Sequence, residues 1–319
     1  MSVQVGVLLP TREAVMAGRV EAAPLLALAS QIEAAGFDSV WVGDSLIARP
    51  RFEPLTLMAA AAAITRRVQL GTAVLLPALR HPLLLAHAVA SLDRIAEGRV
   101  VLGVGVASDN PPVRREFEAA GVPFGERVGR LVQGLALCRR LWSVRGPDER
   151  VSFASKYWTL DGVQVLPTPH RPGGPPIWMG GNAPGALRRA GETADGWFPN
   201  SATADVFAEG WRQVQAHARQ AGRADAVTAA IYLTLCLDDD RARAEDTMRR
   251  FIEGYYAQPY EAMAARQGCH AGPAEGAAAW IEGFVRAGAR HVVLRFAGAD
   301  QADQLARAAA LLPRLRAAA

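Results

Sequence analysis

The chain has very few of the residues that mark disulfide frameworks, metal clusters or Schiff-base chemistry. Its 319 residues include only three cysteines, Cys138, Cys236 and Cys269, which are too few and too widely spaced for a disulfide framework or a metal site. Cys138 falls in an apolar helical stripe, which predicts a core thiol. Lys156 is the only lysine, so a Schiff base has one candidate nucleophile. We predict no metal site.

Long apolar runs and common catalytic motifs are also lacking. The longest apolar run, Leu55–Ile64, is too short for a bilayer, which takes roughly 20 residues. A strand pattern begins at Val3 with no basic region or cleavage site before it, so we expect a soluble, cytoplasmic protein without a membrane partner. The absence of a Walker loop, H-E-x-x-H, G-x-S-x-G and C-x-x-C argues against the common hydrolase and zinc-enzyme classes.

The positive charge balance does not indicate nucleic-acid binding. The formal net charge is +4 and the pI is near 9.3. The arginines are spread along every segment, and no basic run is interleaved with aromatic residues. We therefore expect a solvated surface and no nucleic-acid partner.

One strand–helix–strand unit, from Val68 to Gly105, is the clearest element of the pattern. Two short runs rich in β-branched residues flank a helical segment, in which Pro82 suits the first turn and Gly98 suits the stop. Continuous apolar strands joined by a helix are typical of parallel sheets covered on both faces. The helical spacing predicts one buried face. Its residues are Leu84, Ala88, Leu92 and Ile95.

The rest of the chain repeats this alternation and predicts a (β/α)₈ TIM barrel in a single domain, 1–319. Eight strand patterns start near residues 3, 39, 68, 100, 177, 196, 227 and 291. A barrel would place its chemistry at the carboxyl ends of the strands. A doubly wound open sheet is the alternative.

Two long gaps between strand patterns predict insertions after strands four and seven, at about 106–175 and 255–275. The first insertion contains a predicted hairpin, formed by Val151–Phe153 and Tyr157–Leu160. The second, Tyr255–Gly272, is predicted as a loop able to act as a lid.

Several strand ends carry residues that are able to do chemistry. Asp44 ends the second strand, where it either faces the barrel mouth or caps a neighbouring helix. The turn Gly180–Gly185 precedes a helix, so it is either an anion cradle or an ordinary tight loop. Arg295 ends the last strand and needs an anionic group or an acidic neighbour such as Asp44. His81 begins a helix beside the mouth.

Several segments together resemble the bacterial luciferase-like family of flavin and deazaflavin oxidoreductases, over nearly the whole chain. The matching segments are Ala34–Asp44, Leu70–Val74, Ser91–Arg94, Glu97–Gly105, Gly121–Phe124 with Arg127, Pro175–Gly181 and Ala194–Trp197. The resemblance implies a barrel with a flavin-type ring at its carboxyl-terminal mouth. It also implies a bulge after the third strand, often with a non-proline cis peptide, which here is Ala73–Val74.

The resemblance further implies site residues. Asp44 matches an acidic residue near the ring, and Gly180 and Gly181 match the loop that takes the cofactor phosphate. The expected cofactor-binding residues are Asp44, Thr72, Ala73, Val74, Gly105, Gly180, Gly181, Asn182 and Ala183. The expected catalytic residues are Asp44, His81 and Arg295.

The chain departs from the family at positions that carry acid–base chemistry in other members. Ser45 stands where many members, luciferase among them, have a histidine. Ser108 stands where sugar-phosphate dehydrogenases have a glutamate, which disfavours that substrate, and the arginine that some FMN-using members carry near Val106 is absent. The proton-transfer group stays open among His81, Tyr255 and Tyr256.

The expected function is a flavin-dependent oxidoreductase, first of all a monooxygenase that uses reduced FMN on a small organic substrate. The flavin would do the chemistry, while the protein supplies position and a dry pocket. A flavin reductase would be a partner of such an enzyme. The alternatives are hydride transfer with the deazaflavin coenzyme F420, and a non-catalytic flavin-binding protein. The alanine-dense helix at Leu57–Ile64, together with the resemblance, predicts a homodimer through the early helices.

Overall fold

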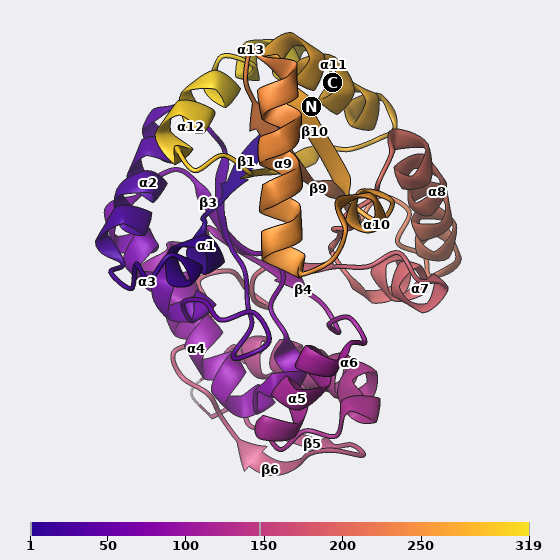
Figure 1. The fold of residues 1–319 in the computed structure, drawn as a ribbon. Coiled ribbons are helices and arrows are strands. Elements are labelled where there is room, and N and C mark those ends of the chain that lie inside the picture. The colour runs from indigo at the N-terminus through magenta and orange to yellow at the C-terminus, as the bar shows by residue number, and fades with distance from the viewer. Residues whose placement is uncertain (1, 147, 319) are drawn as a thin grey trace.

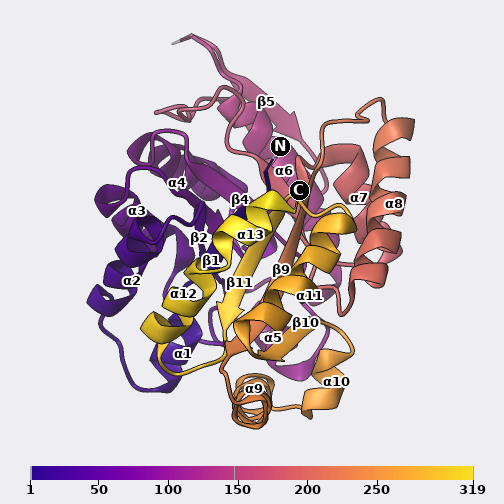
Figure 2. The ribbon, with the colours of Figure 1, turned by 90° about the horizontal axis from the view of Figure 1, so that it is seen from above.

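The computed structural model describes residues 2–146 and 148–318, and in this part of the chain eight parallel strands close into a barrel (Figures 1 and 2). Hydrogen bonding follows the ring order β9, β11, β1, β2, β3, β4, β7, β8, and β8 pairs again with β9. The predicted TIM barrel is therefore confirmed. The barrel strands are β1 (Gln4–Leu8), β2 (Ser39–Val42), β3 (Gln69–Thr72), β4 (Val100–Val104), β7 (Ile177–Met179), β8 (Gly196–Trp197), β9 (Thr228–Leu237) and β11 (His291–Phe296).

Helices surround the strands, and α9 crosses the face that is turned to the viewer in Figure 1. No helix of the described residues has both the length and the apolar composition of a membrane span. The helices are α1 (Thr11–Met16), α2 (Ala23–Ala34), α3 (Pro54–Ile64), α4 (Pro82–Ile95), α5 (Pro111–Ala119), α6 (Arg127–Trp142), α7 (Pro184–Thr193), α8 (Ala204–Gln220), α9 (Arg241–Tyr256), α10 (Tyr260–Ala264), α11 (Ala274–Arg286), α12 (Gln301–Ala309) and α13 (Leu312–Ala317), with 3₁₀ turns at Pro77–Leu79 and Phe124–Glu126.

Large aromatic side chains fill the interior of the barrel. Trp41 is fully buried and its ring lies 5.3 Å from that of Trp178 and 4.9 Å from that of Phe198. The neighbouring strand carries Gly71, where a Cβ atom would lie only 2.3 Å from the Trp41 ring. Glycine is thus required at position 71, because any side chain there would displace Trp41, which fills the interior of the barrel.

The predicted buried face of α4 is wrong. Leu84 and Ile95 are 68% and 50% exposed, because α4 is apolar on more than one side and spacing alone does not select the packed face. The side that is buried meets α6, where the Trp142 indole donates to the Ala86 carbonyl at 3.0 Å. The buried apolar residues of α4 are Pro82, Leu85, Ala86, Val89, Ala90 and Leu92. The homodimer through the early helices stays a prediction.

The two predicted insertions contain different structures. The first contains the expected antiparallel hairpin, β5 (Val151–Ala154) with β6 (Thr159–Val163). The prediction of a loop at Tyr255–Gly272 is wrong, because α9 continues to Tyr256 and is followed by α10 and a strand, β10 (Gly268–Gly272). β8 pairs only with the first residues of β9, so the second half of β9 has an open edge that β10 occupies.

A neutral histidine is buried at the start of β11. The His291 ring nitrogens lie 2.7 Å from the Ser39 hydroxyl and 3.1 Å from the Gln4 side-chain oxygen. Burial lowers the pKa of His291 to about 3. The folded chain therefore holds this ring neutral at pH values where an exposed imidazole would bind a proton.

Acid should weaken the fold through His291. Below pH 6.5, the ordinary pKa of the group, His291 binds a proton in the unfolded chain but not in the folded chain. The free energy of unfolding therefore falls as the pH is lowered towards 3. The loss is about 1.4 kcal/mol per pH unit in this window. Urea unfolding across this range should show a shallower pH slope for His291→Gln, whereas the exposed control His87→Gln should keep the wild-type slope. Equal pH slopes of the unfolding free energy in wild type and His291→Gln would contradict this role of His291.

Candidate active site

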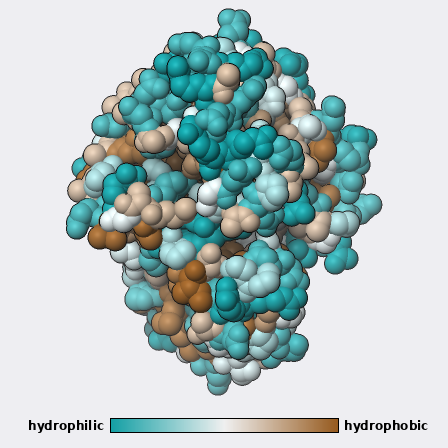
Figure 3. All heavy atoms as spheres, viewed as in Figure 1, coloured by the Kyte–Doolittle hydropathy of each residue, from teal (hydrophilic) through white to brown (hydrophobic). Residues whose placement is uncertain are grey.

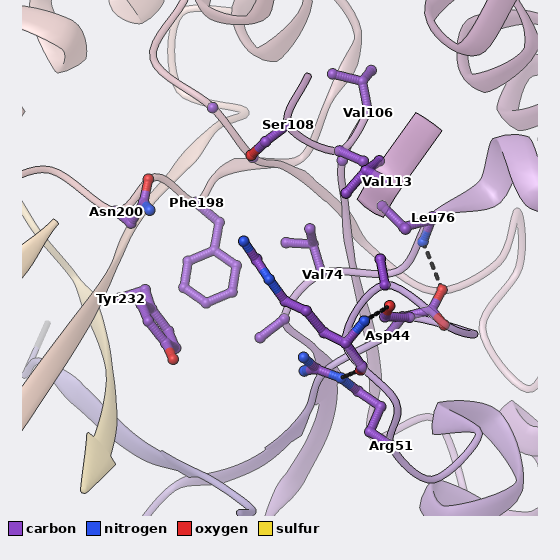
Figure 4. Close-up of a pocket in the computed structure, with 18 of the residues that line it drawn as sticks. Asp44, Arg51, Val74, Leu76, Val106, Ser108, Val113, Phe198, Asn200 and Tyr232 are labelled. Atoms are coloured by element: carbon purple, nitrogen blue, oxygen red, sulfur yellow. Dashed lines mark hydrogen bonds between the residues drawn. The ribbon is translucent and has the colours of Figure 1, made fainter. Parts of the chain in front are cut away.

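A cavity of about 320 Å³ opens at the carboxyl ends of the barrel strands, on the side that α9 crosses. This is the end at which a TIM barrel places its chemistry. Figure 4 shows Val74 in the middle of the cavity wall, between Phe198 and Tyr232 on one side and Asp44 and Leu76 on the other. The lining also includes Arg49, Arg51, Ala73, Gly105, Ser108, Glu116, Gly180, Gly181, Asn200, Tyr255 and Tyr256.

The floor of the pocket is the irregular segment that follows β3. The Ala73–Val74 peptide bond is cis, as the resemblance implied. Both residues line the pocket, whereas Thr72 is buried beneath them and its hydroxyl donates to the Gly103 carbonyl at 2.7 Å. A Cβ atom on Gly105 would lie 2.7 Å from a methyl group of Val74, so glycine leaves this floor open to a flat ligand.

Asp44 lies in the pocket wall, but its carboxylate is held by a neighbour. Arg80 donates to both carboxylate oxygens, at 2.6 and 3.1 Å, and the Leu76 N–H donates at 2.8 Å (Figure 4). The Asp44 side chain is only 1% exposed. The proposed pairing of Asp44 with Arg295 is therefore wrong. Sequence reasoning missed Arg80, because 36 residues separate the partners and no motif joins them.

The glycine turn after β7 presents backbone donors at the start of α7. Gly180 and Gly181 line the pocket, and the exposed Asn182 and Ala183 lie next to them, outside the lining. The N–H groups of Gly181, Asn182 and Ala183 donate to no group of the described chain. Gly181 has φ of +103°, a conformation that favours glycine. Free donors before a helix start suit an anion.

A cation that the sequence analysis did not single out lies beside this turn. A Cβ atom on Gly185 would lie 3.2 Å from Nη1 of Arg189. The Nε atom of Arg189 is buried without a hydrogen-bond partner among the described residues. Burial, and then the charge of Arg188, lower the pKa of Arg189. The sequence feature that points to this cation is the adjacent pair Arg188 and Arg189, one helical turn after the glycine turn.

Gly181→Val should weaken cofactor binding at least tenfold, about 1.4 kcal/mol, because a branched side chain blocks the turn and strains its backbone. Calorimetry with FMN, and with riboflavin as the analogue that lacks the phosphate, measures the effect. The loss should be larger for FMN if the phosphate lies on Gly180–Ala183. Unchanged FMN affinity in a folded Gly181→Val variant would contradict the assignment of the phosphate site to Gly180–Ala183.

Tyr255, from the end of α9, brings a hydroxyl group into the pocket wall. Arg51 donates to this hydroxyl at 3.1 Å, and the Arg12 guanidinium lies over the ring at 4.2 Å. Burial alone would raise the pKa of Tyr255, but the charges of Arg51 and Arg295 outweigh it and hold the pKa below its ordinary value. The hydroxyl proton of Tyr255 has no acceptor in the described chain.

Arg295 does not line the pocket but lies behind the tyrosines that do. It is 2% exposed and donates to the Thr234 hydroxyl at 3.1 Å and to the Tyr256 hydroxyl at 3.3 Å. Its guanidinium also lies 4.6 Å from the centre of the Tyr255 ring. Tyr256 in turn donates to Gln267, at 2.9 Å. Arg295 therefore influences the pocket through Tyr255 and Tyr256, whose side chains line it.

The remaining candidates divide between the pocket and the surface. His81 is exposed, caps α4 by accepting from the Leu83 N–H at 3.3 Å, and lies outside the pocket lining. Ser108 lies at the pocket rim. The Ser45 hydroxyl donates to buried Glu116 at 2.6 Å, and the same carboxylate oxygen accepts from backbone N–H groups of the loop after β2. Glu116 therefore holds this loop in place.

The model of luciferase-like monooxygenases matches residues 3–313. The chain belongs to the luciferase-like monooxygenase family. Among relatives of this luciferase-like chain, an F420-dependent glucose-6-phosphate dehydrogenase of Kineococcus radiotolerans is 32% identical, over 90% of this chain and 91% of its own length. An F420-dependent hydroxymycolic acid dehydrogenase of Mycobacterium tuberculosis is 34% identical, over 74% of this chain and 65% of its own length.

A solved structure shares the luciferase-like fold along the whole chain. It is an F420-dependent secondary alcohol dehydrogenase in complex with an F420-acetone adduct, and its TM-score is 0.84 at 22% identity. The alignment covers 99% of this chain and 100% of that chain. Members of the luciferase-like family are oxidoreductases, and the relatives described above carry F420 rather than FMN in their names.

Proposed function

We propose that this protein is an F420-dependent oxidoreductase that transfers a hydride between the deazaflavin and a carbon atom of a small organic substrate. The observation that supports it most is the 32% identity, over 90% of the chain, with a dehydrogenase named for F420. From the sequence alone, an FMN monooxygenase is the first expectation and F420-dependent hydride transfer the second. The relatives favour the second of these.

The pocket fits a flat ring that carries a phosphate group. Val74 and Gly105 would contact the ring, because they form an open apolar floor without a protruding side chain. The N–H groups of Gly181–Ala183 and the Arg189 guanidinium would hold the phosphate at the start of α7. When bound, the deazaflavin supplies the hydride acceptor or donor, and the chain must supply position and a proton path.

We assign proton transfer to Tyr255. The Asp44 carboxylate is paired with Arg80, and Oε1 of Glu116 is engaged by the Ser45 hydroxyl and the loop after β2, so both carboxylates already have structural roles. Tyr255 lines the pocket, and its pKa is below the ordinary value because Arg51 and Arg295 outweigh the effect of burial. Its hydroxyl proton has no acceptor among the described residues. In alcohol oxidation its oxygen takes the substrate hydroxyl proton, and in carbonyl reduction it returns that proton.

The substrate pocket argues against a sugar phosphate. Ser108 stands at the pocket rim where the sugar-phosphate dehydrogenases of the family have a glutamate, so this chain lacks that acid. Asn200 and Tyr232, which lie to the left of Val74 in Figure 4, supply further polar groups to the pocket. A small secondary alcohol or the corresponding ketone is the substrate class that we expect.

Anaerobic turnover separates the two oxidoreductase alternatives. The protein is mixed with oxidised F420 and a panel of secondary alcohols, and reduction of the coenzyme is followed by the loss of its visible absorbance. The proposal predicts alcohol-dependent reduction without oxygen. Oxygen-dependent product formation with reduced FMN, and none with F420, would replace the proposal with the monooxygenase alternative. Cofactor binding without any turnover would favour the non-catalytic alternative.

A further inference from the structure

Four arginines gather at one side of the barrel mouth, around the two tyrosines at the end of α9. They come from α1, from the loop after β2 and from the end of β11. We call Arg12, Arg49, Arg51 and Arg295 the arginine cluster. Arg12 and Arg295 lie over the Tyr255 ring, at 4.2 and 4.6 Å, and Arg49 lies over the Tyr256 ring, at 5.0 Å.

The arginine cluster has no counter-charge in contact with it. Within residues 2–146 and 148–318, no carboxylate oxygen lies within 4.0 Å of any of its guanidinium groups, whereas arginines elsewhere, such as Arg80, Arg139 and Arg314, have such a partner. Glu13 acts on Tyr255 and Arg295 only through its charge, from a longer distance. Guanidinium groups do not lose their proton, so four positive charges stand here against one nearby carboxylate, that of Glu13, which forms no ion pair with them within the described residues.

Several donors of the arginine cluster also lack partners. The Nε atom of Arg295, which is 2% exposed, and Nε and Nη1 of Arg12 are buried without a hydrogen bond. The Arg49 side chain makes no hydrogen bond to the described residues, yet it lines the pocket together with Arg51. Buried donors left without acceptors cost free energy, which an incoming acceptor would recover.

The arginine cluster lies across the mouth from the proposed phosphate site. In the ring order of the barrel, β1 lies directly opposite β7, with three strands between them on either side. The cluster follows β1, β2 and β11, whereas the glycine turn follows β7. A ring over Val74 with its phosphate at Gly181 would therefore leave the arginine-rich side to the substrate. The face around α9 is mainly hydrophilic as well (Figure 3).

We propose that the arginine cluster binds an anionic group, a carboxylate or a phosphate, of the substrate. Arg49 and Arg51 are the direct ligands, since both line the pocket and a guanidinium fork matches two oxygens of such a group. Arg12 and Arg295 add positive charge from behind the tyrosines. This inference deepens the proposed function and rests on it only for the statement that the anion belongs to the substrate. The substrate is thereby narrowed to a secondary alcohol or ketone that also carries a carboxylate or phosphate group and is not a sugar phosphate.

Binding of inorganic phosphate and of acetate to the cofactor-free protein tests the arginine cluster, with calorimetry as the readout and Gly181→Val as the background that removes the separate phosphate site at the glycine turn. Arg49→Gln should weaken binding at least tenfold while the unfolding free energy is kept, because Arg49 makes no side-chain hydrogen bond. Arg51→Gln should also weaken it. Arg250→Gln is the matched control, since Arg250 is exposed and paired with Asp246, and it should bind like wild type. Equal binding in wild type and Arg49→Gln would overturn the site.

The same variants separate a substrate anion from a cofactor anion. If the anion belongs to the substrate, Arg49→Gln binds F420, FMN and riboflavin as wild type does. A loss of F420 or FMN affinity with unchanged riboflavin affinity would assign the cluster to the cofactor phosphate and overturn the substrate assignment. Because phosphate binding needs no F420, it distinguishes a failure of the proposed function from a failure of the anion site.

Discussion

Tyr255→Phe should lower kcat/KM for hydride transfer about 100-fold or more, the range for removing a general acid or base. The variant keeps the ring that lies beneath the arginines and loses only the hydroxyl that accepts from Arg51 at 3.1 Å. Cofactor affinity should hold, because the phosphate site lies across the barrel. Steady-state kinetics with F420, together with calorimetric binding, measure both quantities.

The pH profile distinguishes proton transfer from a structural role for Tyr255. In alcohol oxidation the phenolate must accept the proton, so the rate rises with pH through the pKa of Tyr255. The Arg295 charge is one of those that lower this pKa, so Arg295→Met should move the rise to higher pH. Tyr256→Phe is the matched control and should leave the profile in place. A Tyr255→Phe variant with wild-type kcat/KM would refute the assignment.

Asp44→Asn should lower the free energy of unfolding by about 2–3 kcal/mol, because it leaves the Arg80 charge with only the exposed Glu53 as a partner. The Asp44 side chain is 1% exposed, so water does not replace the lost charge. The asparagine still has an acceptor for the Leu76 N–H. Denaturant unfolding measures the change.

Asp225→Asn, at an exposed turn, is the control and should not alter stability. If Asp44 acted instead as a catalytic base, Asp44→Asn would abolish turnover with an unchanged unfolding free energy. That outcome would contradict the ion-pair role given to Asp44 here.

The strand pattern predicted the barrel because parallel strands buried on both faces are continuous apolar runs with helices between them. The strand near residue 268 was not predicted, because Gly268–Gly272 has little β-branched character and forms a strand only by filling the open edge of β9. Likewise, α4 is apolar around much of its surface, so packing against α6 rather than spacing decides which residues are buried.

At the site, residues that follow a strand directly were predictable and long-range partners were not. Val74 and Gly180 follow β3 and β7, and the barrel brings them to one pocket. The partners Arg80 and Arg51 reach Asp44 and Tyr255 across 36 and 204 residues, and no sequence spacing encodes such pairs. His81 was chosen for its residue type, and its position at the exposed start of α4 separates it from the pocket.

Calorimetric binding of F420 and of FMN to the purified protein, under the same anaerobic conditions, separates an F420-dependent enzyme from an FMN-dependent one. The proposed function predicts that F420 binds at least tenfold more tightly than FMN, a difference of about 1.4 kcal/mol. Tighter binding of FMN, or no binding of F420, would contradict it.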